Sequence, residues 1–276
     1  LAYTGLADAH NVLAQFGEIP PSEAMPKART AALRALELDP NLAEAHVSLG
    51  AILEAYDWNW SEAERSYRRA IELNPQLSAA HLWYGMFLRD QGRQAEALPE
   101  LETAYRLNPT AQLSSLNMAF VYSARGDRNA ALNQIHKALE IDPTCAKTYI
   151  NLALAYHTQS RAEDAAAAFE RAHELSAAEP RTLARLGAVY ATTGKMDEAR
   201  RTLSEVEHLA GTRYVSSFDL ALLHAAVGHT ERAVQLLERA YQERSAGMIY
   251  LRMEKIGELR SHPRVRELVS RMRLPG

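Results

Sequence analysis

The sequence of 276 residues lacks features that define several large classes of proteins. Its single cysteine, Cys145, excludes an internal disulfide framework and any metal site built from several cysteines. The formal net charge of -3 gives no basic excess of the kind that nucleic-acid or membrane binders carry. The longest nearly apolar stretch, Phe218 to Val227, is far short of the roughly 20 residues that a membrane span needs. The sequence therefore predicts no membrane span and no nucleic-acid binding by this segment.

Motifs for catalysis and cofactor binding are missing as well. The sequence contains no Gly-rich phosphate loop and no Gly-x-Ser-x-Gly elbow. The ten histidines are scattered and form no His-x-x-x-His pair. We therefore predict no catalytic residues, no metal site and no cofactor, and we expect that the segment is not an enzyme.

The sequence does contain a repeat with a period of 34 residues. Four series share this spacing, apart from a first step of 35 residues in the alanine and proline series. They are alanine at 28, 63, 97, 131, 165, 199 and 233; alanine again at 35, 70, 104, 138, 172 and 240, with Val206 in the gap; proline at 40, 75, 109 and 143; and glycine at 92, 126, 194 and 228, with Ser160 in the remaining slot. A fixed period of 20 to 50 residues indicates a stack of identical supersecondary units.

Each series has a structural role in a pair of helices. Small residues such as Gly50 and Gly85 let the two helices of a unit approach closely. The later glycines can adopt the left-handed conformation that ends a first helix. The Asp-Pro and Asn-Pro pairs end the second helix, because proline disfavours the helical conformation in the residue before it. The pattern predicts helix, turn, helix and stop.

This pattern resembles that of the tetratricopeptide-repeat (TPR) family over residues 1 to 245. The resemblance implies an all-α fold, a right-handed α-solenoid (superhelix) of about seven helical hairpins with a C-terminal capping helix. We expect a repeat array over residues 1–247 and a cap over 248–276. The expected units are about 1–42, 43–77, 78–111, 112–145, 146–179, 180–213 and 214–247.

Three units depart from the regular pattern. The first carries an insertion around Glu18 to Pro26, and the sixth lacks the closing proline. The second has one extra residue near Trp58 and Trp60. These two tryptophans could form an exposed docking platform, but we expect them to pack the loop down.

Several stretches outside the repeat consensus resemble the C-terminal TPR region of multidomain bacterial regulators. These stretches are residues 3–9, 56–60, 213–216, 243–245 and 259–264. In such regulators the N-terminal part is a winged-helix DNA-binding domain, a nucleotide cyclase or a Ser/Thr kinase. Because the chain begins at Leu1 without methionine, we expect it to be a piece of a longer protein. The expected location is cytoplasmic, unless the parent protein has an upstream membrane span.

The family also implies where a ligand binds. In stacked TPR hairpins the first helices line a concave groove, and positions 2, 5, 6, 9, 12 and 13 of each unit face into it. The groove residues predicted in this way are Trp83, Met86, Leu116, Asn117, Phe120, Lys147, Ile150, Asn151, Leu154, His157, Arg181 and Arg185. The expected partner is a protein or peptide segment.

Five of these residues resemble the set with which some TPR domains grip the terminal carboxylate of a peptide. They are Asn117, Lys147, Asn151, Arg181 and Arg185. The family pattern has a lysine where this sequence has Leu113, which changes the geometry. The alternative is that the asparagines are merely solvated and that Arg185 pairs with a neighbouring acid. Five arginines near the C-terminus could contact nucleic acid: Arg260, Arg264, Arg266, Arg271 and Arg273. We expect instead that they form a solvated face on the capping helix or a contact surface for a neighbouring domain.

The function predicted from these residues is a protein- or peptide-binding TPR module, the sensory or regulatory part of a larger bacterial signalling or transcription regulator. The alternative is a structural scaffold that self-associates into a homo-oligomer. In that case the groove would be filled by the protein's own chain or by a second copy.

Overall fold

The chain folds into helices only, within the residues that the structure describes. The computed structural model describes residues 1–15, 19–176, 179–251 and 257–274. Its elements are α1 (Ala2–Gln15), α2 (Pro21–Leu38), α3 (Ala43–Ile52), η1 (Leu53–Asp57), α4 (Trp60–Leu73), α5 (Ser78–Asp90), α6 (Gln94–Leu107), α7 (Gln112–Ala124), α8 (Arg128–Ile141), α9 (Ala146–Thr158), α10 (Ala162–Leu175), α11 (Pro180–Thr192), α12 (Met196–Ala210), α13 (Ser217–Ala226), α14 (Thr230–Gln242), η2 (Ala246–Tyr250), η3 (Gly257–Ser261) and α15 (Pro263–Arg271).

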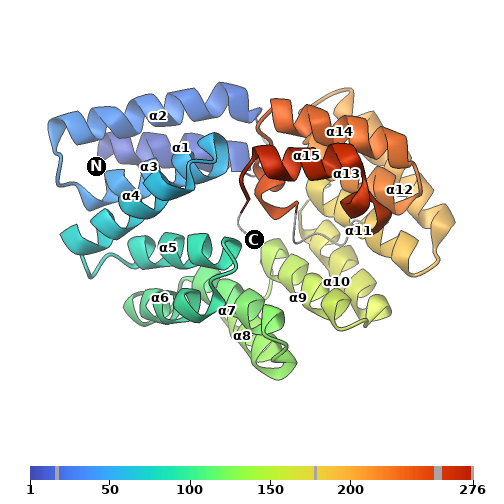
Figure 1. The fold of residues 1–276 in the computed structure, drawn as a ribbon. Coiled ribbons are helices and arrows are strands. Elements are labelled where there is room, and N and C mark those ends of the chain that lie inside the picture. Colours follow the sequence, from blue (N-terminus) through green and yellow to red (C-terminus); the bar gives the residue numbers. More distant parts are fainter. Residues whose placement is uncertain (16–18, 177–178, 252–256, 275–276) are drawn as a thin grey trace.

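Consecutive helices pair into hairpins, and the hairpins stack into a solenoid. Each odd-numbered helix from α1 to α13 packs against the even-numbered helix that follows it, and each hairpin contacts the next (Figure 1). The predicted all-α solenoid is therefore confirmed. None of the helices in the described ranges is long and apolar enough to span a membrane.

The ends of the helices follow the turn residues of the repeat. Helices α2, α4, α6 and α8 each end one residue before the Asp or Asn that precedes proline. The side chain of Asp39 then accepts the N–H of Asn41 at 2.9 Å, and Asp142 accepts that of Thr144 at 2.8 Å. All four glycines of the turn series have φ between 76° and 87°, and Ser160 has φ 61° in the same slot. The predicted left-handed turns are confirmed.

The small residues on the first helices make room for large side chains on the second. A Cβ atom at Gly50 would lie 2.7 Å from the ring of Tyr67, and one at Gly85 would lie 2.8 Å from Leu101. Both of these large residues are fully buried. The helices therefore approach closely because the glycine of one accepts the side chain of the other.

The irregular units have local explanations. The insertion in the first unit lengthens α2 to 18 residues, starting at Pro21, whereas Glu18 lies outside the described residues. In the second unit α3 continues into η1, a turn of π-helix, before Trp58 takes up the left-handed conformation at φ 56°. A π-helical turn accommodates one extra residue in a helix. In the sixth unit, which lacks the closing proline, α12 runs for 15 residues.

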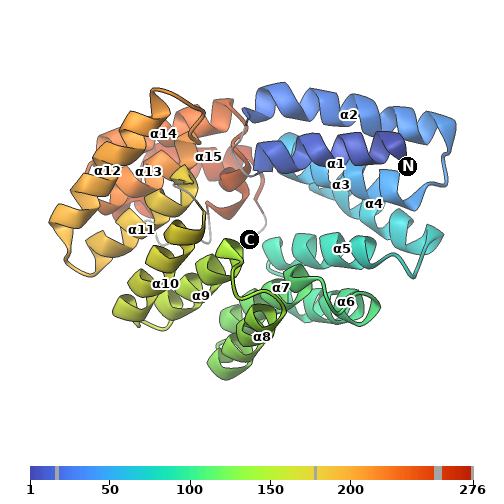
Figure 2. The same cartoon turned by 180° about the vertical axis from the view of Figure 1, so that it is seen from behind.

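The solenoid curls so far that its C-terminal end meets the second hairpin (Figures 1 and 2). Trp58 packs against the ring of Tyr241 at a centroid distance of 5.0 Å, and the Arg244 guanidinium lies 3.9 Å from the Trp58 ring centroid. Trp60 donates its indole N–H to the carbonyl oxygen of Met272 at 3.1 Å. Trp58 is only 8% exposed and Trp60 is half-buried, so neither forms an exposed platform; both pack against the C-terminal end of the chain.

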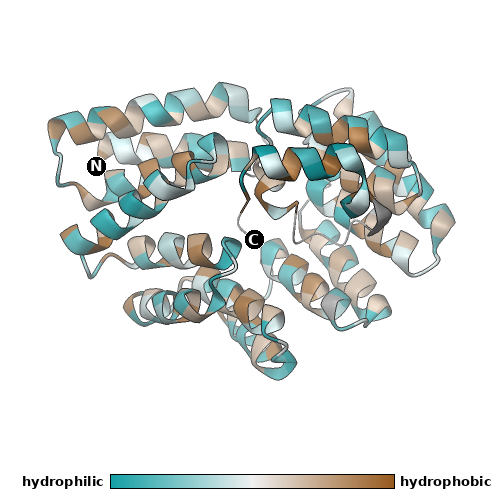
Figure 3. Cartoon of the chain, in the orientation of Figure 1, coloured by the Kyte–Doolittle hydropathy of each residue, from teal (hydrophilic) through white to brown (hydrophobic). Residues whose placement is uncertain are grey.

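The last helix covers the end of the repeat array. Helix α15 packs on α14, with Val265, Leu268 and Met272 buried. Arg264 donates to Glu238 of α14 through its Nε at 2.7 Å. Hydrophobic and hydrophilic residues alternate along α15, as along the other helices (Figure 3). The contacts of Arg264 with Glu238 and the buried apolar side chains therefore fix α15 on α14.

Candidate binding cavity at the centre of the solenoid

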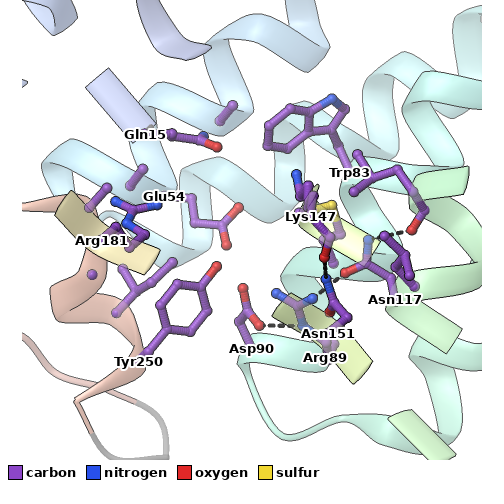
Figure 4. A pocket seen from close by; sticks show the side chains of 18 of the residues that line it. Gln15, Glu54, Trp83, Arg89, Asp90, Asn117, Lys147, Asn151, Arg181 and Tyr250 are labelled. Atoms are coloured by element: carbon purple, nitrogen blue, oxygen red, sulfur yellow. Dashed lines mark hydrogen bonds and ion pairs between the residues drawn. The ribbon is translucent and has the colours of Figure 1, made fainter. Parts of the chain in front are cut away.

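A cavity of about 220 Å³ lies where the curled solenoid encloses its own centre. Its walls are formed by first helices of the repeat and by the turn η2 that follows the last hairpin (Figure 4). The lining residues are Gln15, Ala51, Glu54, Ala55, Trp83, Met86, Arg89, Asp90, Leu113, Leu116, Asn117, Lys147, Asn151, Arg181, Arg185, Asp219, Ala246, Gly247, Ile249 and Tyr250.

One wall of the cavity is cationic and comes from helices α9 and α11. Arg181 and Arg185 lie four residues apart, on one face of α11, and Lys147 and Asn151 lie on one face of α9. Arg181 donates its Nε to the buried carboxylate of Asp219 at 3.3 Å. Within the described part of the chain its Nη1 and Nη2 have no hydrogen-bond partner. Two parallel N–H donors of this kind match the two oxygens of a carboxylate.

Lys147 is held in a poorly hydrated position on this wall. Burial lowers the pKa of its ammonium group, and the positive charge of Arg181 acts in the same direction. Its backbone carbonyl accepts the Asn151 side-chain amide at 2.8 Å. The remaining amide oxygen of Asn151 has no partner among the described residues. An anion in the cavity would therefore meet cations that little water screens.

Arg89 also lines the cavity, but its guanidinium group is engaged by other residues of the protein. Its guanidinium donates to Asp90 at 2.6 Å and to the Asn117 amide oxygen, and it lies 4.8 Å from the ring centroid of Phe120. The Asn117 amide nitrogen donates to the backbone oxygen of Leu113 at 2.7 Å. Asn117 thus holds Arg89 in place with its oxygen, and that oxygen is not open to a ligand.

Another part of the cavity wall carries two carboxyl groups. Glu54 of η1 accepts the hydroxyl of Tyr67 at 2.8 Å, and Asp90 ends α5 beside it. Burial, with the neighbouring negative charge of Asp90, raises the pKa of Glu54 to about 8. Burial also raises the pKa of Asp90, while Arg89 opposes this. The Glu54 carboxyl is therefore mostly protonated at neutral pH.

Among the described residues that line the cavity, the balance of charge is positive. Four of these side chains are cationic, against the three carboxyl groups of Glu54, Asp90 and Asp219. The excess is one positive charge when all are ionised, and two when Glu54 is protonated. The cavity is therefore matched to an anionic group.

The structure brings eight of the twelve predicted groove residues to this one cavity. They are Trp83, Met86, Leu116, Asn117, Lys147, Asn151, Arg181 and Arg185. The other four do not line it: Phe120 lies under Arg89, Ile150 and Leu154 pack against the core around Leu152 and Phe169, and His157 is half-buried in the last turn of α9. The role of all twelve in binding stays a prediction.

Besides Arg89 and Asp90, which occupy positions 12 and 13 of the third unit, three cavity residues used in the description above were missing from the predicted set. Glu54 occupies position 12 of the second unit and Asp219 position 6 of the seventh, so the positional rule finds both when it is applied to every unit. Tyr250 lies after the repeats, and no periodic signal points to it. Its place in the cavity follows only from the curvature of the whole solenoid.

The protein's own chain covers part of the groove. The turn η2 contacts α1, η1 and α13. It approaches Phe218 so closely that Gly247 has no room for a side chain. Residues 246–250 therefore close the groove on this side. The alternative hypothesis included a groove that the protein's own chain fills, and these residues fill part of it. Self-association stays a prediction. In the described ranges no group of three His, Cys, Asp or Glu side chains could hold a metal ion.

Comparisons with known proteins agree with this architecture. Family models described as tetratricopeptide repeat match residues 58–111 and 116–180, 156–218, and 215–239. No curated protein has a significantly matching sequence.

Solved structures share the fold. A thermophilic TPR protein of Thermus thermophilus has 21% identity and a TM-score of 0.58, covering 71% of this chain and 99% of its own. A tetratricopeptide repeat protein from Parabacteroides merdae has 15% identity and a TM-score of 0.59, covering 99% of each chain. The Cut9–Hcn1 structure has 17% identity and a TM-score of 0.65, covering 97% of this chain and 48% of that one. By its repeats, its hairpins and these matches, the chain belongs to the tetratricopeptide-repeat family.

Proposed function

We propose that the chain is a recognition module that binds the carboxyl terminus of a partner polypeptide in its central cavity. TPR proteins mediate protein–protein interactions, which fits a segment without a catalytic family assignment. The observation that carries the proposal is the convergence of Lys147, Asn151, Arg181 and Arg185 from two successive first helices on one cavity. The two terminal nitrogens of Arg181 supply donors that the described protein leaves open.

The size of the cavity supports the end of a chain as the ligand. Pockets for drug-sized molecules have volumes of about 300 to 1,000 Å³. The cavity volume of about 220 Å³ suits the last one or two residues of a polypeptide rather than a segment that runs through the solenoid. The turn η2, which closes one side of the groove, limits the length of ligand in the same way.

The biological setting is part of the same proposal. We propose that the module belongs to a larger signalling or transcription regulator, which the stretches that resemble the C-terminal TPR region of bacterial regulators support. In that setting the module senses a partner and an effector domain elsewhere in the protein responds. The resemblance supports this context, and the cavity supplies the site of recognition.

The test compares hexapeptides that differ only at the terminal carboxyl group. We expect a free carboxylate to bind at least about tenfold more tightly than the C-terminal amide, because the charge-assisted hydrogen bonds to Arg181 are lost in the amide. The variant R181A should remove this preference. Fluorescence anisotropy of labelled peptides measures both affinities.

A matched control for R181A is R201A, since Arg201 lies on the outer helix α12 and pairs with Glu198. This variant should bind like the wild type. Equal affinity for the acid and the amide in the wild-type protein would refute the proposal. Circular dichroism checks that both variants keep the helicity of the wild type.

A further inference from the structure

Among the described residues, Glu54 is a buried carboxyl group without a cation of its own. The residue is 5% exposed, and its Oε2 accepts the Tyr67 hydroxyl. Its Oε1 has no hydrogen-bond partner in the part of the chain that the structure describes. The cation that acts on Glu54, Arg89, is already paired with Asp90. Burying a carboxyl group costs free energy unless a partner compensates it, so this wall leaves a position open for a hydrogen-bond donor.

Two more groups face the same position. The Asp90 side chain is 4% exposed and uses Oδ1 for Arg89, whereas its Oδ2 has no partner among the described residues. The carboxyl groups of Glu54 and Asp90 and the hydroxyl of Tyr250 converge in Figure 4. Two carboxyl groups and a phenol accept hydrogen bonds from several directions, which suits an ammonium group with its three N–H donors.

The charges at this position balance when a cation takes the place of a proton. With Glu54 protonated, Asp90 and Arg89 cancel each other, and the group is neutral. When a ligand's ammonium group binds, Glu54 can release its proton and the group stays neutral. The position therefore accepts a positive charge without leaving a net charge buried.

We propose that the cavity reads the last residue of its ligand at two points, and that this residue is basic. Its terminal carboxylate lies on the cationic wall at Arg181, and its side-chain ammonium group lies between Glu54, Asp90 and Tyr250. The inference rests on the proposed function, that the cavity binds a carboxyl terminus. It adds the identity of the terminal side chain.

The test uses hexapeptides with free carboxylates that end in lysine, norleucine or glutamate. Norleucine keeps an unbranched aliphatic stem and lacks the charge. At pH 8.5 the lysine peptide should bind at least about tenfold more tightly than the norleucine peptide, and the glutamate peptide should bind most weakly. The isosteric variant E54Q should bring the lysine and norleucine affinities within about twofold of each other. E102Q, at an exposed position of α6, should keep the wild-type ratio.

A second measurement needs no variant. Below its pKa Glu54 must lose a proton before it pairs with the ligand, so the affinity of the lysine peptide should fall between pH 8.5 and pH 6.5, by up to about tenfold per unit. The titratable and charged groups that act on this carboxyl are Tyr67, Arg89, Asp90 and Tyr250. The ratio of lysine to norleucine affinity isolates Glu54 from the groups on the cationic wall, because both peptides carry the same carboxylate.

The outcomes separate this inference from the proposed function. Equal affinities of the lysine and norleucine peptides at both pH values would overturn the inference alone, provided that the free carboxylate still binds more tightly than the amide. A failure of every free-carboxylate peptide to bind would overturn both. A lysine preference that persists unchanged in E54Q would also overturn the inference.

Discussion

At the scale of single residues, the centre of the molecule is built from charged groups that the protein has only partly neutralised. Arg89 donates hydrogen bonds to Asp90 and Asn117. Arg181 donates one, from its Nε, to Asp219. Among the described residues, one oxygen of Glu54 and the two terminal nitrogens of Arg181 remain open. Perturbed, incompletely paired groups in a cavity are typical of functional sites.

The protonation of Glu54 predicts how stability depends on pH. Because burial raises the pKa of this carboxyl to about 8, the folded protein holds a proton that the unfolded chain has lost above its ordinary pKa of 4.5. The free energy of unfolding of the wild type should therefore fall as pH rises from 5 to 8. E54Q cannot ionise, so its stability relative to the wild type should grow by up to about 1.4 kcal/mol per pH unit.

Urea unfolding followed by circular dichroism at pH 5, 6, 7 and 8 measures this difference. The exposed-site variant E102Q should follow the wild type at each pH. Parallel pH profiles for E54Q and the wild type would show that Glu54 ionises normally in the folded protein.

At the scale of elements, the joint between the second hairpin and the C-terminal end is the feature that distinguishes this solenoid. One extra residue turns the end of α3 into the π-helical turn η1, which presents Glu54 to the cavity and is followed by Trp58 in the joint. Trp58 belongs to the same hydrophobic cluster as the buried residues of α13, α14 and α15. The joint and the cavity wall are therefore parts of one continuous segment.

Replacing Trp58 by alanine should open this joint. The loss of a buried tryptophan costs about 3 to 5 kcal/mol, because alanine can neither pack against the Tyr241 ring nor lie beneath the Arg244 guanidinium. We expect faster hydrogen exchange in residues 53–57 and 246–250, with α5 to α10 unchanged, measured by mass spectrometry.

The variant W60F is the milder control for the same joint. It removes the hydrogen bond to the Met272 carbonyl, worth about 1 kcal/mol, and part of the ring surface, but it keeps an aromatic ring at this position. Exchange rates in W58A that match the wild type across residues 246–250 would mean that the joint does not hold the solenoid closed.

The helices and turns could be predicted from the sequence because each is specified locally. Proline after Asp or Asn stops a helix, glycine permits the left-handed turn, and these signals repeat every 34 residues. The eight groove residues that line the cavity followed from the resemblance to the TPR family, which says which positions of each unit face the groove. The positions of Phe120 and Leu154 did not, because whether a groove residue faces a ligand or its neighbours depends on the curvature of the stack.

At the scale of the whole molecule, the solenoid encloses its own centre. An open TPR groove exposes its first helices along their length, whereas here η2 reaches α1 and η1 and leaves a cavity of about 220 Å³. Tyr250 could not be predicted as a cavity residue for this reason, since its approach to Glu54 depends on contacts between residues far apart in the sequence. Because η2 closes the groove, the remaining cavity suits the end of a polypeptide chain rather than an extended peptide.

A crystal structure of the protein with a hexapeptide that ends in a free lysine residue tests this account most directly. We predict the terminal carboxylate in the central cavity, within hydrogen-bond distance of the Arg181 guanidinium, with the lysine ammonium group beside Glu54. A peptide bound at full occupancy on the outer helices, with the cavity filled only by water, would contradict the account.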